Sequence, residues 1–147
     1  MRLGMHSWIS AIAIGVMLVI ATAWDLRRGE IPGLLTLAGL AAGLVTSVMS
    51  GSGLATSLIG ASVGVGLFVG LVLLGGMGIG DAWLMAAIGA WTSWQFVLTA
   101  ALWASLAGGL IAVGVVVTCP KGLNWRRRMY PYVPAIAVGT TVAWFLQ

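Results

Sequence analysis

The chain has 147 residues, 61% of them hydrophobic, and a mean hydropathy of +1.09. Soluble globular domains do not carry so much apolar sequence, so we expect a protein embedded in a lipid bilayer. Seven basic and three acidic residues give a formal charge of +4. The bases lie in short clusters between apolar runs, as in loops that orient membrane helices, and this pattern argues against a nucleic-acid partner.

Thiol and metal chemistry have little support in this sequence. Cys119 and His6 are each the only residue of their type. A single cysteine cannot form an internal disulfide, and no cluster has the spacing of a zinc site. We therefore expect no metal and no cofactor, so that carboxylates, hydroxyls or backbone groups must carry any chemistry.

Six apolar runs follow one another along the chain, each bounded by glycine, proline, serine or charge. They cover residues 8–24, 34–49, 54–74, 82–94, 96–117 and 133–145. None alternates as a barrel strand would, and in lipid the backbone of each segment must satisfy its own polar groups. The sequence predicts an all-α fold, a polytopic membrane bundle of six transmembrane helices that forms one membrane-embedded domain over residues 1–147.

The fourth and sixth runs are short, since 13 residues rise only about 20 Å against a hydrocarbon core of roughly 30 Å. Charge favours counting both as spans. With six spans, only Arg2 lies outside, and the cytoplasmic loops contain six bases: Arg27, Arg28, Lys121, Arg126, Arg127 and Arg128. We therefore predict that both termini lie outside.

Small residues and tryptophans support this plan. Three glycine pairs predict close helix packing: Gly39/Gly43, Gly60/Gly64 and Gly66/Gly70. Tryptophans near the predicted span ends predict an aromatic belt, with Trp24 and Trp125 at the cytoplasmic side and Trp8, Trp91, Trp94 and Trp144 at the external side.

Two of the three acids lie at predicted helix ends. Asp25 closes the first run and Asp81 opens the fourth, so the topology brings both to the cytoplasmic boundary. Ionisable groups at this depth are costly and usually have a partner or a function. Two carboxylates at one membrane depth are a candidate catalytic dyad.

A carboxylate dyad hydrolyses a peptide when one member takes a proton from water and the other, protonated, polarises the carbonyl. Close like charges enforce this division. Asp81 begins a helix, where the dipole favours an anion, so we assign it as the resting base and Asp25 as the acid. Structural roles are the alternative: Asp81 could cap its helix, and Asp25 could pair with Arg27 or Arg28.

Three segments together resemble the type IV prepilin peptidases, aspartyl proteases with a GxGD motif. Residues 25–32 (DLRRGEIP) are similar to the family's first cytoplasmic loop, in which Ile31 and Pro32 follow the aspartate and the bases. Residues 76–81 (GMGIGD) are similar to the GxGD motif, with Gly78 and Gly80 before Asp81. Residues 131–139 (PYVPAIAVG) are similar to the entry of the last helix. The resemblance covers nearly the whole chain and implies that Asp25 and Asp81 are catalytic.

The sequence departs from the family at two positions. Gly33 stands where the family often has Asn, and Trp83 where it often has Lys. Neither departure removes a carboxylate. The large members of the family have an added cytoplasmic domain and are also N-methyltransferases. We expect no comparable insertion between the predicted helices, so the resemblance is closest to the short, peptidase-only type associated with Flp or tight-adherence pili.

The resemblance implies cleavage of the leader of a pilin-like precursor at the cytoplasmic face of the bacterial or archaeal inner membrane. Such leaders are basic, so Glu30 is a weak candidate for binding them, whereas the basic loops more naturally orient the protein and contact anionic lipid. Two other functions stay open: a non-enzymatic pilus assembly subunit and a small transporter. The sequence does not identify the pilin, the cleavage sequence or the oligomeric state.

Overall fold

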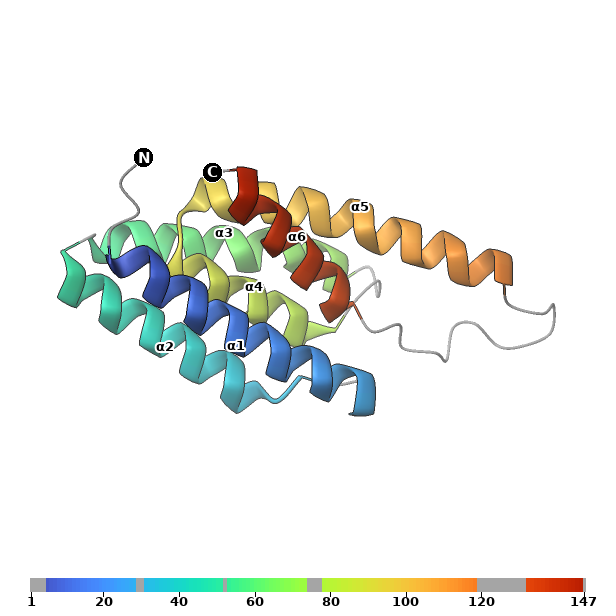
Figure 1. The fold of residues 1–147 in the computed structure, drawn as a ribbon, viewed down its shortest axis with the longest axis horizontal. Helices are drawn as coiled ribbons and strands as arrows, with labels where there is room; N and C mark the ends of the chain where they lie inside the picture. The colour runs from blue at the N-terminus through green and yellow to red at the C-terminus, as the bar shows by residue number, and fades with distance from the viewer. Residues whose placement is uncertain (1–4, 29–30, 52, 74–77, 119–131, 147) are drawn as a thin grey trace.

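The computed structural model describes residues 5–28, 31–51, 53–73, 78–118 and 132–146, and all their regular structure is helical. Helices α1 to α6 follow the predicted order, so the all-α prediction is confirmed (Figure 1). Their bounds are α1 Met5–Arg28, α2 Gly33–Ser50, α3 Leu54–Leu73, α4 Ile79–Trp91, α5 Trp94–Thr118 and α6 Val133–Leu146.

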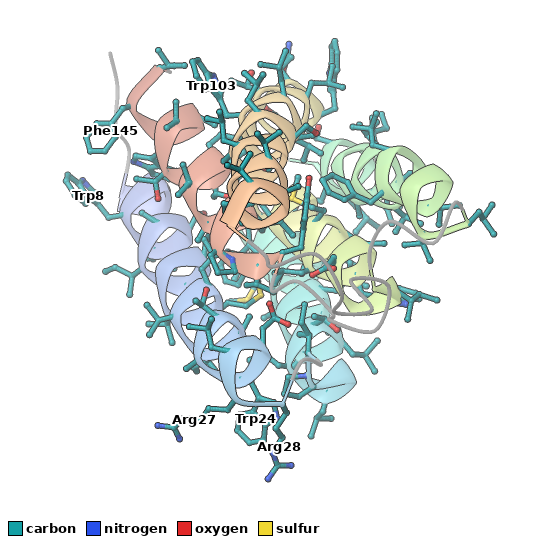
Figure 2. The ribbon with its side chains drawn as sticks, turned by 90° about the vertical axis from the view of Figure 1, so that its right-hand side faces the viewer. Trp8, Trp24, Arg27, Arg28, Trp103 and Phe145 are labelled. Atoms are coloured by element: carbon teal, nitrogen blue, oxygen red, sulfur yellow. The ribbon has the colours of Figure 1, made fainter. Side chains whose placement is uncertain are left out.

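Among the described residues, three segments are long and apolar enough to cross a membrane: Trp8–Arg28, Gly33–Ser50 and Trp94–Gly114. Three further helices are apolar but shorter: Leu54–Gly70, Ile79–Trp91 and Val133–Leu146. Large apolar side chains cover the outside of the bundle, and Figure 2 shows Trp8, Trp103 and Phe145 pointing away from it. An apolar exterior of this kind suits lipid rather than water as the surrounding solvent.

The short helix α4 lies inside the bundle and packs against α1, α2, α3 and α5. Its middle is fully buried, with Leu84, Met85 and Ile88 each 0% exposed. A helix enclosed by protein makes its lateral contacts with other helices instead of with lipid. Its length therefore need not match the full hydrocarbon thickness.

Glycines allow α3 to approach α4 closely. A Cβ added to Gly60 would collide with the backbone carbonyl of Gly89, and one added to Gly89 would collide with that of Gly60. One turn along, a Cβ on Gly64 would lie 2.6 Å from the carbonyl oxygen of Met85. The predicted packing role of the Gly60/Gly64 pair is confirmed.

Of the other two glycine pairs, one packs closely as predicted and the other does not. Gly39 and Gly43 face side chains of α1 and α4, as expected. Gly66 and Gly70 have no atom within 4 Å of an added Cβ, so the prediction of close packing at this pair is wrong for the described chain. Gly60/Gly64 and Gly66/Gly70 have the same spacing in sequence. They differ in packing because no described helix lies against the glycine face of the C-terminal part of α3.

Trp91 has a different environment from the one expected of a belt residue. Its indole N–H donates a hydrogen bond of 2.8 Å to the carbonyl oxygen of Gly39, across the contact between α4 and α2. Trp144 packs edge-on against Phe96 at a ring-centroid distance of 5.8 Å. Both tryptophans therefore join helices to one another, in addition to any contact with the membrane boundary.

Candidate active site

The two aspartates of the predicted dyad lie at the same end of the bundle. Asp25 is in the last turn of α1 and Asp81 in the first turn of α4, and Figure 1 shows this end opposite the chain termini. Both side chains are buried, Asp25 with 8% and Asp81 with 7% of its surface exposed. Although 56 positions apart in sequence, they are close enough to interact electrostatically.

Asp81 is held by the turn that opens its own helix. Gly78, in an extended conformation, is the N-cap of α4, and Asp81 is the third helical residue. The backbone N–H of Gly78 donates to Asp81 Oδ2 at 3.2 Å. This back-bond resembles the carboxylate half of a capping box, which stabilises a helix start and fixes the side-chain direction. The structural role considered for Asp81 is thus present, and it also orients the carboxylate.

Asp25 is held by a helix distant in sequence. Its Oδ2 accepts a hydrogen bond of 3.3 Å from the N–H of Val133, the first residue of α6. Figure 2 shows Arg27 and Arg28 pointing out of the bundle, and the Arg28 guanidinium lies 5.1 Å from the ring centroid of Trp24. The described partner of Asp25 is therefore a backbone donor, and the pairing considered with Arg27 or Arg28 does not account for its position.

Both carboxylates consequently lie at the N-terminus of a helix, Asp81 at α4 and Asp25 at α6. The positive end of a helix dipole and its free N–H groups favour an anion at each site. Asp25 also lies in the last turn of α1, whose negative dipole end disfavours an anion there. The dipoles therefore still favour Asp81 as the base, but by less than the sequence indicated.

The Ile-Pro and GxGD segments also meet here. A Cβ added to Gly80 would lie 3.1 Å from Cβ of Ile31, so Ile31 packs directly over this glycine. Pro32 is the N-cap of α2, and its carbonyl oxygen accepts the N–H of Leu35 at 2.9 Å. The Ile31–Gly80 contact therefore ties the segment before α2 to the start of α4, just ahead of Asp81. Glu30, Gly76 and Met77, named in the sequence motifs, lie outside the described residues.

Tyr132 is a residue near the dyad that the sequence analysis did not single out. It directly precedes α6 and lies close enough to Asp81 for an electrostatic interaction. The motif at residues 131–139 contains Tyr132, but it predicted only the entry of the last helix. In the described part of the chain no three His, Cys, Asp or Glu side chains gather as metal ligands.

Comparisons with known proteins identify the family of the chain. The type IV leader peptidase family matches residues 12–113, a range that includes both aspartates. The chain belongs to this family. It is 33% identical to the prepilin leader peptidase/N-methyltransferase of Burkholderia pseudomallei (strain K96243), over 93% of this chain and 46% of that protein. It is also 33% identical to leader peptidase HopD of Escherichia coli, over 86% of each chain.

Another relative in the leader peptidase family is the prepilin leader peptidase/N-methyltransferase of Aeromonas hydrophila, 31% identical over 92% of this chain and 48% of that protein. The chain thus spans about half the length of these bifunctional relatives. No solved structure is significantly similar to it.

The two departures from the family pattern lie next to the site residues in sequence, Gly33 after Pro32 and Trp83 two residues after Asp81. The Trp83 side chain is 44% exposed, unlike the buried aspartate two residues before it. Gly33 begins α2 and has no atom within 4 Å of an added Cβ. Neither residue is the described backbone donor to a carboxylate.

Proposed function

We propose that this chain is an aspartyl endopeptidase that removes the leader of pilin-like precursors at the cytoplasmic membrane boundary, with Asp25 and Asp81 as its catalytic pair. One observation carries the proposal: two buried carboxylates from separate helices interact at one end of an apolar bundle. The membership of the chain in the leader peptidase family and the names of its relatives support the substrate class.

In the proposed reaction the pair shares one proton, because two adjacent carboxylates cannot readily both ionise. The ionised member takes a proton from water while the protonated member donates a hydrogen bond to the scissile carbonyl. The resulting hydroxide attacks the carbonyl carbon. The C–N bond then breaks as a carboxyl group supplies a proton to the leaving amine. The N–H donors of Gly78 and Val133 support this chemistry by fixing one oxygen of each carboxylate.

The position of the pair suits a substrate that is itself anchored in the membrane. The leader of such a precursor ends just before a hydrophobic helix, so the scissile bond reaches the bilayer boundary where Asp25 and Asp81 lie. We place this boundary on the cytoplasmic side because Arg27 and Arg28 follow Asp25 directly. Glu30 remains a weak candidate for contact with a basic leader.

The direct test is incubation of the purified protein, in detergent or liposomes, with a pilin-like precursor, followed by mass measurement of both fragments. We expect one cut before the hydrophobic helix by the wild-type protein and none by Asp25→Asn or Asp81→Asn. Size-exclusion profiles control for folding of each variant. A precursor that is bound but left intact by the wild-type protein would favour an assembly subunit, and cutting by well-folded Asp81→Asn would exclude the aspartyl dyad.

A further inference from the structure

In the first turn of α6, one backbone N–H is not used by the helix or its N-cap residue Tyr132. The N–H groups of Ala135 and Ile136 both donate to the carbonyl oxygen of Tyr132, at 3.0 and 3.2 Å. Pro134 has no N–H. Of the first four positions of the helix, only Val133 therefore has an N–H that is not used within α6, and this donor bonds to Asp25.

The Tyr132 ring fixes this end of α6 against two other helices. A Cβ added to Gly108 of α5 would lie 2.5 Å from Cε2 of Tyr132, so the ring sits in a notch that the missing side chain leaves open. The ring also packs edge-on against Phe68 of α3, with centroids 6.5 Å apart. Its hydroxyl donates to the carbonyl oxygen of Ala104 over a long 3.5 Å and also bonds to Ser105.

Further along α6, a second close contact joins this helix to α5. A Cβ added to Gly139 of α6 would lie 2.5 Å from the backbone nitrogen of Ala104. The middle of α6 is therefore fixed independently of Tyr132. The seating of Tyr132 in the Gly108 notch additionally holds the first turn of α6, where a small displacement changes the distance from the Val133 N–H to Asp25.

We propose that Tyr132, seated in the Gly108 notch, is a positioning residue that holds the first turn of α6 so that the Val133 N–H stays on Asp25. The proposal rests on the proposed function for its catalytic consequence. The hydrogen bond favours the ionised form of Asp25, so its loss makes the carboxylate pair hold its proton more tightly. Tyr132 acts through Asp25 and need not touch the substrate.

In the part of the chain that the structure describes, few other ionisable groups lie near Asp25. Among the described residues, the charged or titratable side chains near Asp25 are Asp81 on α4, Tyr132 before α6, and Arg27 and Arg28, which point away on α1 itself. The described residues of α2 and α6 contain no ionisable side chain. A change at the Gly108 notch therefore leaves the number of charges around Asp25 unaltered and acts through geometry.

The chain offers a matched pair of variants for the test. Gly108→Ala pushes against the Tyr132 ring, whereas Gly109→Ala meets no atom within 4 Å. Both lie within α5 and gain the same helix propensity. Tyr132→Phe keeps the ring and removes the hydroxyl, and Tyr132→Ala removes both.

We expect Gly108→Ala and Tyr132→Ala to cleave precursor more slowly than the wild type, and the acid limb of their pH–rate profile to lie higher by about half a pH unit or more. Gly109→Ala should match the wild type, and Tyr132→Phe should stay close to it. Identical pH–rate profiles for Gly108→Ala and Gly109→Ala would overturn the positioning role while leaving the peptidase assignment intact.

A second measurement needs no activity. The sequence has only three side-chain carboxyls, so in an Asp81→Asn, Glu30→Gln background Asp25 is the one that remains. Infrared spectroscopy can follow its protonation directly. We expect the Asp25 midpoint to rise when Gly108→Ala, but not Gly109→Ala, is added to this background. An unchanged midpoint with Gly108→Ala overturns the proposal even if no precursor is cleaved.

Discussion

Asp25 and Asp81 each have one oxygen held by a backbone N–H, and this geometry sets what their amide variants can do. The carbonyl oxygen of Asn can accept the same hydrogen bond, but Asn cannot exchange the proton that hydrolysis requires. If the carboxylates act as one unit, their removal is not additive. We expect the double variant Asp25→Asn/Asp81→Asn to be about as inactive as either single variant, measured as the single-turnover rate of precursor cleavage. A double variant slower by the product of the two single effects would contradict a shared mechanism.

A shared proton also predicts a bell-shaped pH dependence. At low pH both carboxyls are protonated and no base remains, whereas at high pH both are ionised and no acid remains. The rate of cleavage at saturating precursor should therefore fall on both sides of an optimum. The two apparent constants belong to the pair and not to named residues. A rate that rises to a plateau without falling again would indicate that only one carboxylate takes part.

The co-location of the two aspartates could be predicted from sequence because it needs only helix order and direction. Their partners could not. The Val133 N–H reaches Asp25 from 108 positions away, and its direction depends on how α6 packs on α5. The contact of Ile31 with Gly80 likewise depends on the path of two loops. The second positive helix end, which α6 brings to Asp25, could not be predicted from sequence either, and the assignment of Asp81 as the base stays a prediction.

At the scale of helices, the close contact of α3 with α4 positions Asp81. We expect Gly64→Ala to lower the stability of the protein by about 1–3 kcal/mol, because the added methyl overpacks against the Met85 carbonyl. Gly66→Ala, with open space around it, serves as the control. Thermal unfolding in detergent measures both. Equal stability of the two variants would show that α3 and α4 do not pack through Gly64.

Helix boundaries were largely predictable because long apolar runs end at glycine, proline or charge. The expected fourth run, 82–94, is offset from α4, which begins at Ile79 and ends at Trp91. The Gly78 to Asp81 back-bond starts the helix earlier than hydrophobicity indicated. Glycine spacing was less informative, since the Gly60/Gly64 and Gly66/Gly70 pairs look alike in sequence and differ only in whether a helix faces them.

At the scale of the whole molecule, the arrangement of the helices constrains the orientation in the membrane. The N- and C-termini lie at one end of the bundle, and the carboxylate pair lies at the other (Figure 1). In the proposed six-span arrangement, the start of α1 and the end of α6 lie on the side of the membrane opposite the aspartates. The bases at residues 27–28 and 121–128 favour an orientation with the aspartates at the cytoplasmic face, because basic loops tend to remain on the cytoplasmic side of the membrane.

This orientation can be tested by labelling single cysteines in a Cys119→Ser background. We expect Gly29→Cys and Gly122→Cys to be shielded from an impermeant thiol reagent in intact cells and labelled after the membrane is opened. Ser52→Cys, between α2 and α3, should be labelled in both conditions and serves as the external control. Labelling of both Gly29→Cys and Gly122→Cys in intact cells, with Ser52→Cys shielded, would reverse the orientation and place the dyad outside. Labelling of only one of the two would break the six-span topology itself, because an even number of spans must separate these loops if both are cytoplasmic.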